Sequence, residues 1–232
     1  MFFKKKRVFD TELISLHIPK TAGTSFRHML KEVYGDDQVV RFDINEKGIA
    51  RLNQQIYEET KLPSVKVIHG HFSFTDITSM AYDQQSVKMI TWLRNPVSRV
   101  ISNYFYLEQR LKDLLDEEKN QLNILSKMQR SLMEYARAEV NRNRQSKFLR
   151  GADMDAFDFI GIQEDFDRDI IALAGALGWS DLPPVLHHNK TKSERHKLSS
   201  DILEEIRDLN KDDVQWYHNV LKMRGKNIED YA

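Results

Sequence analysis

Residues 19–25, with the sequence P-K-T-A-G-T-S, combine a lysine and a glycine with three hydroxyl side chains. The apolar run Leu13 to Leu16 precedes them, and apolar residues recur at helical spacing from Phe26 onward. A strand, a tight loop and a helix aim several backbone N–H groups and the positive end of the helix dipole at one point. The sequence therefore predicts a phosphate-binding loop, although an ordinary turn with a lysine at its edge is the alternative. The candidate ligands are Lys20, Thr21, Ala22, Gly23, Thr24 and Ser25.

A second candidate anion site follows the apolar run that ends at Leu93. Arg94 can offer a planar, bidentate guanidinium to a phosphate, and Pro96 suits the first position of a helix. Ser98 and Ser102 are four residues apart on that helix, so their hydroxyl groups share a face. The alternative for Arg94 is a salt bridge at the helix edge. We expect Arg99 to form a surface ion pair.

The third candidate is the histidine pair of His69-Gly70-His71, at the end of the apolar run 65–68. A histidine beyond a strand end can serve as a general base at neutral pH, since its unperturbed pKa lies near 6.5. A metal pair and a buried, hydrogen-bonded histidine are the alternatives, the latter above all for His69. We interpret His17 as structural.

Strands and helices alternate along the chain, which predicts a mostly parallel sheet flanked by helices and connected by right-handed crossovers. Ligands of such sheets bind beyond the carboxyl ends of the strands, where the loops after Leu16, Ile68 and Leu93 would all lie. The predicted strands cover 13–16, 39–42, 65–68, 87–93 and 157–162, and the predicted helices cover 26–33, 49–60, 97–107, 117–140, 166–177, 200–209 and 212–223.

Composition limits the class of protein. The 232 residues fit one domain, 1–232, and 35 basic against 35 acidic residues give no overall attraction to nucleic acid or membranes. The absence of cysteine excludes disulfides, thiolate metal sites and cysteine nucleophiles. Residues 1–7 look like a charged leader, but no apolar segment follows them and no stretch is long enough for a membrane span. We expect a cytoplasmic protein with no membrane span and no nucleic-acid partner.

Two anion loops on separate strands suit a nucleotide that has phosphates at both ends. The Walker A order G-x-x-x-x-G-K-[ST] is absent, and no strand ends in a convincing aspartate for Mg²⁺, as an ATP enzyme would need. The spacing therefore disfavours ATP.

The motifs resemble those of sulfotransferases that use 3′-phosphoadenosine 5′-phosphosulfate (PAPS). The loop P-K-T-A-G-T-S is similar to their 5′-phosphosulfate loop, and Arg94 with Ser102 is similar to their 3′-phosphate site. The stretch H-G-H-F-S-F resembles the uronyl and heparan sulfate 2-O-sulfotransferases. The resemblance implies a P-loop-like three-layer fold, His71 as the base, His69 as a supporting residue and Lys20 as the group that stabilises charge on the bridging oxygen.

Weaker similarities lie farther along the chain. Residues 141–149 resemble a polar and basic segment of carbohydrate and bacterial sulfotransferases, with a solvated helix end as the alternative. Residues 161–164 resemble the family's late strand-to-helix turn. The resemblance also carries over Lys190 and Thr191, from a loop over the nucleotide, as cofactor ligands. The family's usual Arg-Asp-Pro is Arg-Asn-Pro here, and the chain is short, which leaves the acceptor open.

We therefore expect a sulfotransferase that moves the sulfuryl group of PAPS to a hydroxyl of a saccharide, releasing 3′,5′-adenosine bisphosphate (PAP) without a metal. A P-loop-like nucleotide kinase and a non-catalytic nucleotide-binding protein are the alternatives.

Overall fold

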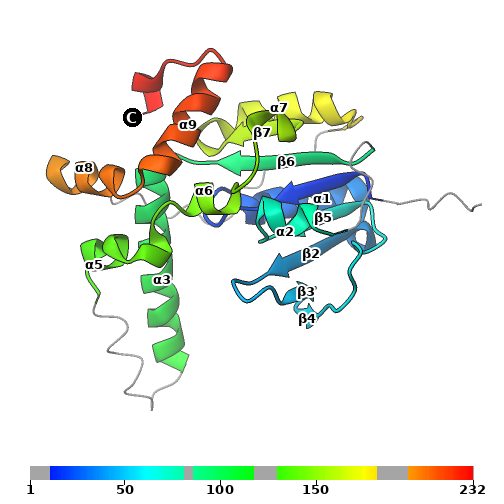
Figure 1. Cartoon of the computed structure of the whole chain (residues 1–232), viewed down its shortest axis with the longest axis horizontal. Coiled ribbons are helices and arrows are strands. Elements are labelled where there is room, and N and C mark those ends of the chain that lie inside the picture. Colours follow the sequence, from blue (N-terminus) through cyan, green and yellow to red (C-terminus); the bar gives the residue numbers. More distant parts are fainter. Residues whose placement is uncertain (1–10, 81–85, 118–129, 182–197, 232) are drawn as a thin grey trace, which may run out of the picture.

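The computed structural model describes residues 11–80, 86–117, 130–181 and 198–231, with the backbone alone for 112–117. Its seven-stranded sheet has the order β4-β3-β2-β5-β1-β6-β7 (Figure 1). The five strands from β2 to β7 run parallel, and only β3 and β4 are added antiparallel at one edge. The mostly parallel α/β sheet is confirmed. The strands are β1 (Leu13–Leu16), β2 (Val39–Ile44), β3 (Ala50–Leu52), β4 (Gln55–Ile56), β5 (Val67–Gly70), β6 (Lys88–Leu93) and β7 (Phe159–Ile162).

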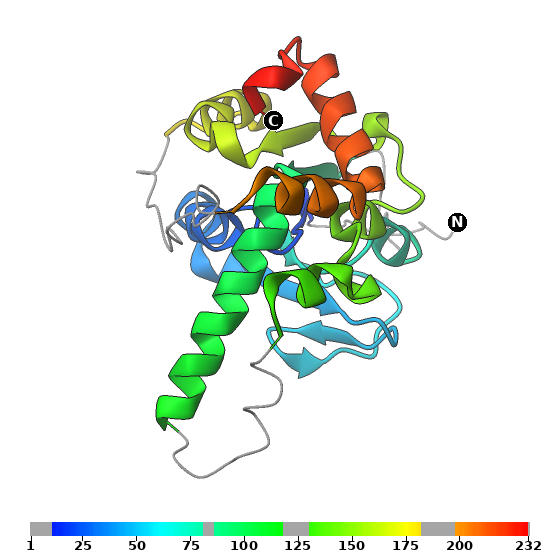
Figure 2. The same cartoon turned by 90° about the vertical axis from the view of Figure 1, so that its left-hand side faces the viewer.

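Helices cover both faces of the sheet. The helices are α1 (Gly23–Tyr34), α2 (Phe74–Thr78), α3 (Pro96–Glu117), α5 (Leu132–Arg137), α6 (Arg144–Phe148), α7 (Phe166–Leu177), α8 (Ser200–Asp208) and α9 (Lys211–Met223). Figure 2 shows α1 and α7 on one side of the sheet and α2, α6 and α9 on the other. Side chains alternate along a strand, and in β1 and β5 both alternating sets are buried, with Ser15 and His69 as the polar members of an otherwise apolar pair of strands. Leu13 and Val67 pack with α1 and α7, whereas Ile14 and Ile68 belong to the core with α2 and α9.

A third apolar cluster lies beyond the carboxyl edge of the sheet. There α3 contributes Val97 and Ile101, α5 contributes Tyr135, and α8 contributes Ile206. This cluster fixes the first turns of α3 close to the end of β6. None of the helices in the described ranges is long and apolar enough to cross a membrane.

The predicted helix over 49–60 is wrong. Residues 50–56 form the hairpin of β3 and β4, joined through Asn53 and Gln54, whose φ angles of 47° and 75° are both positive. Such a pair matches the twist of a two-residue hairpin turn, and the side-chain Oδ1 of Asn53 accepts a hydrogen bond from the backbone N–H of Arg41 at 2.9 Å. The apolar spacing predicts that Ile56 lies on the buried face of a helix, but its side chain in β4 is 67% exposed.

The predicted helix over 117–140 is only partly covered, since residues 118–129 lie outside the described residues. Within the rest, α5 begins after a capping box made by Ser131 and Glu134, and it ends at Arg137 because Ala138 has extended backbone angles. The prediction therefore overran the end of α5. The other predicted strands and helices occur, 13–16 and 166–177 with the predicted bounds and the rest with shifted ends.

Candidate functional site

The loop between β1 and α1 folds into a tight, partly strained turn. Lys20 and Ala22 have φ angles of 74° and 66°, which are unusual for residues other than glycine and cost about 1–3 kcal/mol each. The buried hydroxyl of Thr21 donates to the carbonyl of Ile18 at 2.8 Å. Thr21 therefore holds the loop from inside, whereas Thr24 is exposed and Ser25 half-buried at the start of α1.

Glycine is required at position 23 by a close approach. A Cβ atom there would come within 1.9 Å of the His17 imidazole. Ala22 makes no side-chain capping hydrogen bond, and the first turn of α1 contains no acidic residue. The turn therefore presents N–H groups and a positive helix end that no acidic side chain of that turn neutralises.

Lys20 and Arg94 bring positive charge to the same loop. Nη1 of Arg94 donates to the Lys20 carbonyl at 3.2 Å, which ties the end of β6 to the loop. Burial, and then the charge of Arg94, lower the pKa of Lys20 to about 8. Nε of Arg94 is shielded from water without a hydrogen-bond partner among the described residues, so it remains available to an anionic ligand.

The first turns of α3 pass beside this loop. Nζ of Lys20 lies 4.0 Å from the ring centroid of Tyr106, a cation–π contact. Ser98, Ser102 and Tyr106 are spaced four residues apart and share one helix face. Since Tyr106 contacts Lys20, that face, with the buried Ser102, is the one toward the loop.

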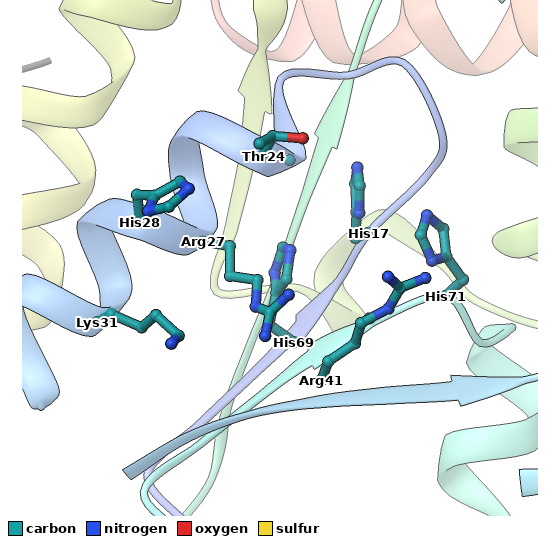
Figure 3. A pocket seen from close by; sticks show the side chains of 10 residues that line it. His17, Thr24, Arg27, His28, Lys31, Arg41, His69 and His71 are labelled. Carbon is teal, nitrogen blue, oxygen red and sulfur yellow. The ribbon is translucent and has the colours of Figure 1, made fainter. Parts of the chain in front are cut away.

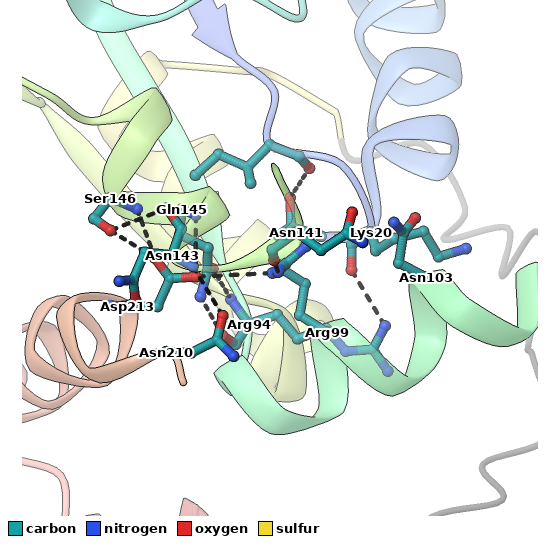
Figure 4. Close-up of polar contacts among 12 residues, drawn as sticks. Lys20, Arg94, Arg99, Asn103, Asn141, Asn143, Gln145, Ser146, Asn210 and Asp213 are labelled. Carbon is teal, nitrogen blue, oxygen red and sulfur yellow. Dashed lines mark hydrogen bonds and ion pairs between the residues drawn. The ribbon is translucent and has the colours of Figure 1, made fainter. Parts of the chain in front are cut away.

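A buried polar network fixes the backbone of Arg94 (Figure 4). The side chain of Gln145 accepts from the Arg94 N–H and donates to the Arg94 carbonyl, both at 2.9 Å. The carboxylate of Asp213 in turn accepts from the backbone N–H groups of Gln145 and Ser146 and from the Ser146 hydroxyl. Residues 141–149 are thus not a solvated helix end.

Arg99 corrects an expectation, because it lies in this network and not at the surface. Its side chain is 1% exposed, and its Nε is 3.9 Å from the Asp213 carboxylate. Its Nη2 donates to the Asn141 carbonyl at 3.3 Å. The pair of Arg99 on α3 and Asp213 on α9 fixes the two helices relative to each other, because separating them would leave a buried charge unpaired.

His71 forms a dyad with Asp43. One carboxylate oxygen of Asp43 accepts from the backbone N–H of His71 at 2.9 Å and lies 2.9 Å from its ring Nδ1. The other accepts from Nε of Arg41 at 2.6 Å. Partial burial opposes ionisation of Asp43, but its bonds with His71 and the charge of Arg41 outweigh it and lower the pKa to about 2. Asp43 is therefore ionised, and Nε2 of His71 is the ring nitrogen left for chemistry.

The other two histidines complete a stack of rings. The His17 ring lies between those of His69 and His71, with centroid distances of 5.0 and 4.5 Å. Burial first, and positive neighbours second, lower the pKa of His69 to about 3 and that of His17 well below its usual value. Both are thus neutral at physiological pH, and Nδ1 of His69 lies 2.9 Å from the Ser15 hydroxyl. Within the described ranges, no three or more histidines and carboxylates gather as a metal site.

The stack borders a cavity of about 230 Å³ between α1 and the ends of β1, β2 and β5 (Figure 3). His17, His69 and His71 all line it, so His17 belongs to the site region although its sequence position suggested a structural role. Its remaining lining residues are Gly23, Thr24, Arg27, His28, Lys31, Arg41 and Gly70.

The remaining sequence candidates lie elsewhere. Lys190 and Thr191 fall outside the described residues. In the turn over 161–164, the Glu164 carboxylate accepts from the backbone N–H of Asn95 and from the Tyr217 hydroxyl, both at 2.9 Å, which makes this turn part of the framework behind Arg94. Sequence reasoning missed Asp43, Arg41 and Asp213, because no motif includes them. It included Gln145 only as part of the segment 141–149 and gave it no role.

Comparison with known proteins identifies the family of the chain. A family model described as "Sulfotransferase family" matches residues 8–219. The structure is similar to a sulfotransferase from Alicyclobacillus acidocaldarius, at 15% identity and a TM-score of 0.50 over 97% of this chain and 99% of that one. It is also similar to mouse sulfotransferase SULT7A1 complexed with PAP, at 11% identity and a TM-score of 0.47 over 76% of this chain and 61% of that one. A search of curated proteins gave no match. With the family model covering most of its length, the chain belongs to the sulfotransferase family.

Proposed function

We propose that this sulfotransferase uses PAPS as its donor and sulfates a hydroxyl group of a carbohydrate, with His71 as the base. The observation that carries the proposal is the pair of cationic positions at the carboxyl ends of β1 and β6. Arg94 contacts the backbone of Lys20, and its Nε has no partner among the described residues. One ligand with two separated phosphates would satisfy both positions.

The residues fit the ends of such a nucleotide. The N-terminal amides of α1, with Thr24 and Ser25, would hold the 5′-phosphate, and Thr21 would keep the loop in shape through its bond to Ile18. Arg94 and Ser102 would hold the 3′-phosphate. When bound, PAPS supplies the sulfuryl group that the enzyme transfers.

The chain's own residues supply the rest of the chemistry. Nε2 of His71 would accept the proton of the acceptor hydroxyl, while the Asp43 carboxylate holds the ring through Nδ1 and stabilises the imidazolium that forms. The acceptor oxygen bonds to sulfur as the bond from sulfur to the bridging oxygen breaks. Lys20 would offset the negative charge that develops on that bridging oxygen.

Thermal unfolding with PAP, and separately with ATP·Mg²⁺, tests the donor. A ligand at 100 times its Kd adds about 2.7 kcal/mol, which raises Tm by roughly 5–10 °C for a chain of this size. We expect this shift with PAP and little with ATP·Mg²⁺. A shift with ATP·Mg²⁺ alone would contradict the PAPS assignment and favour a nucleotide kinase.

The matched control is an exposed arginine to which the proposal gives no role. Arg94→Ala should abolish most of the PAP shift, whereas Arg207→Ala, on the exposed surface of α8, should retain it. Equal shifts in both variants would show that PAP binds elsewhere.

A further inference from the structure

The segment that follows α9 folds back toward the carboxyl ends of β6 and β7. The helix ends at Met223, and a turn at Gly225, whose φ angle is 63°, leads to a short 3₁₀ helix, Ile228–Tyr231. Figure 2 shows this segment, in red, returning beside α7. We call residues 224–231 the strap. The strap is distant from both anion loops in the sequence, so it can act on them only through contacts in the fold.

The strap is anchored to the start of α7 by ion pairs. The guanidinium of Arg224 donates two hydrogen bonds to the carboxylate of Asp169, which is fully buried. One oxygen of Asp165 accepts from Nζ of Lys226 at 2.8 Å and from the Tyr231 hydroxyl at 2.6 Å. Separating a buried pair would leave a charge unpaired, so these contacts hold the strap in one position.

The strap reaches the site at Asn95, which directly follows Arg94. Asn95 is 7% exposed, and both ends of its side-chain amide are bonded. Nδ2 donates to the Tyr231 carbonyl at 2.7 Å, and Oδ1 accepts from the backbone N–H of Ser98 at 3.0 Å. These partners fix the orientation of the amide, because a carbonyl needs a donor and an N–H needs an acceptor. Asn95 therefore caps α3 and holds the strap at the same time.

An aspartate at position 95 could do only one of these two things. An ionised carboxylate accepts hydrogen bonds, so it would cap α3 as well as the amide does. It has no hydrogen for the Tyr231 carbonyl, which would then face a negative charge. The contact between the strap and the start of α3 therefore depends on the amide of Asn95.

Both flanks of Arg94 are fixed as a result. Gln145 bonds to the backbone N–H and carbonyl of Arg94, and the strap holds Asn95 at the next position. The backbone N–H of Asn95 also donates to the Glu164 carboxylate at 2.9 Å. A side chain whose backbone is held in this way loses less conformational freedom when it binds a ligand, and binding is stronger for that reason.

We propose that the strap positions Arg94 through Asn95, so that residues 224–231 determine how tightly the enzyme holds the 3′-phosphate of its nucleotide. This inference rests on the proposed function, because it takes Arg94 as a ligand of that phosphate. Asn95 and Tyr231 are positioning residues that act through Arg94, since both ends of the Asn95 amide are bonded within the protein. Binding of a nucleotide without a 3′-phosphate should therefore not depend on the strap.

The test compares two nucleotides that differ in the 3′-phosphate. Kd values for PAP and for adenosine 5′-monophosphate (AMP) are measured by calorimetry on the full chain, and the Tm of each unliganded variant is recorded. Asn95→Ser keeps an oxygen that can cap α3 but loses the donor for the strap. We expect it to weaken PAP binding about 3- to 10-fold, the usual effect of losing one hydrogen bond, and to change AMP binding less than about twofold. Asn95→Asp should also weaken PAP binding.

Tyr231→Ala tests the other side of the contact. It removes the hydroxyl that bonds to Asp165 and should weaken binding of PAP, but not of AMP, by a similar factor. The double variant with Asn95→Ser should bind PAP no more weakly than the weaker single variant, because both changes break one contact. Asn219→Ser on α9, where the side chain accepts from Gln215, is the matched control and should bind both nucleotides as the wild type does.

Unchanged PAP affinity in Asn95→Ser, or equal losses for PAP and AMP, would overturn the proposal. Additive effects of Asn95→Ser and Tyr231→Ala would overturn it too. A loss confined to Asn95→Asp would also overturn it, by assigning the effect to a negative charge beside Arg94. Failure of the wild type to bind PAP more tightly than AMP would instead contradict the proposed function, because Arg94 would then hold no 3′-phosphate.

Discussion

The two halves of the site differ in how their charges are held. On the β1 and β6 side, the framework around Arg94 is hydrogen-bonded from behind by Gln145, Asp213 and Glu164. On the β2 and β5 side, Arg27 and Arg41 face a cavity, and the single acid Asp43 is shared. The half that we propose for the donor is thus held by a hydrogen-bonded framework, whereas the half that we propose for the acceptor presents cations to a cavity. This comparison separates residues that should affect nucleotide affinity from residues that should affect turnover.

The largest effect should come from His71→Ala. Loss of the base should lower kcat by about 10²–10⁴, because general-base catalysis contributes that much. The Kd for PAP should stay unchanged, since His71 lies in the acceptor half. Measuring turnover with PAPS and PAP affinity by calorimetry on the same preparation checks both. Near-normal turnover would show that His71 is not the base. A weakened PAP complex would show that His71 also contributes to nucleotide binding.

Arg94→Ala tests the donor half. The change should weaken PAP binding by roughly 2–5 kcal/mol, the usual cost of removing one partner from a buried charge pair. It should also loosen the loop, because Nη1 of Arg94 donates to the Lys20 carbonyl. Calorimetric titration with PAP measures the loss, with Arg207→Ala as the control. An unchanged affinity would refute the role of Arg94.

The donor half was predictable because its residues are contiguous in sequence. The loop over 19–25 and the stretch after Leu93 each place a cation, a helix start and hydroxyl groups within a few positions. Parallel strands then bring these two loops to one edge of the sheet, which the alternation of strands and helices already implied. Both the α/β fold and the neighbourhood of Lys20 and Arg94 therefore followed from local patterns.

The acceptor half depends on register, which no local pattern gives. Asp43 reaches His71 because β2 pairs in parallel with β5, and the two residues are 28 positions apart. On its other side β2 pairs with β3 of the hairpin, where the apolar spacing of the sequence predicts a helix. Arg99 was misplaced for a related reason, since its partner Asp213 lies on α9 at the other end of the chain. From sequence alone, an arginine in the first turns of a helix is expected at the surface, because the distant carboxylate that allows it to be buried cannot be identified.

The smallest of the three effects should come from Asp43→Asn, which tests whether Asp43 positions His71. The amide keeps a hydrogen-bond acceptor for Nδ1 of His71 but removes the negative charge, and a hydrogen bond to a charged group contributes about 1.5–3 kcal/mol. We expect kcat to fall by roughly 10- to 100-fold with unchanged PAP affinity. The Tm of the variant is measured beside kcat. A lower kcat at unchanged Tm would support a role of Asp43 in positioning His71, whereas a Tm that falls together with kcat would argue that Asp43 only supports the end of β2.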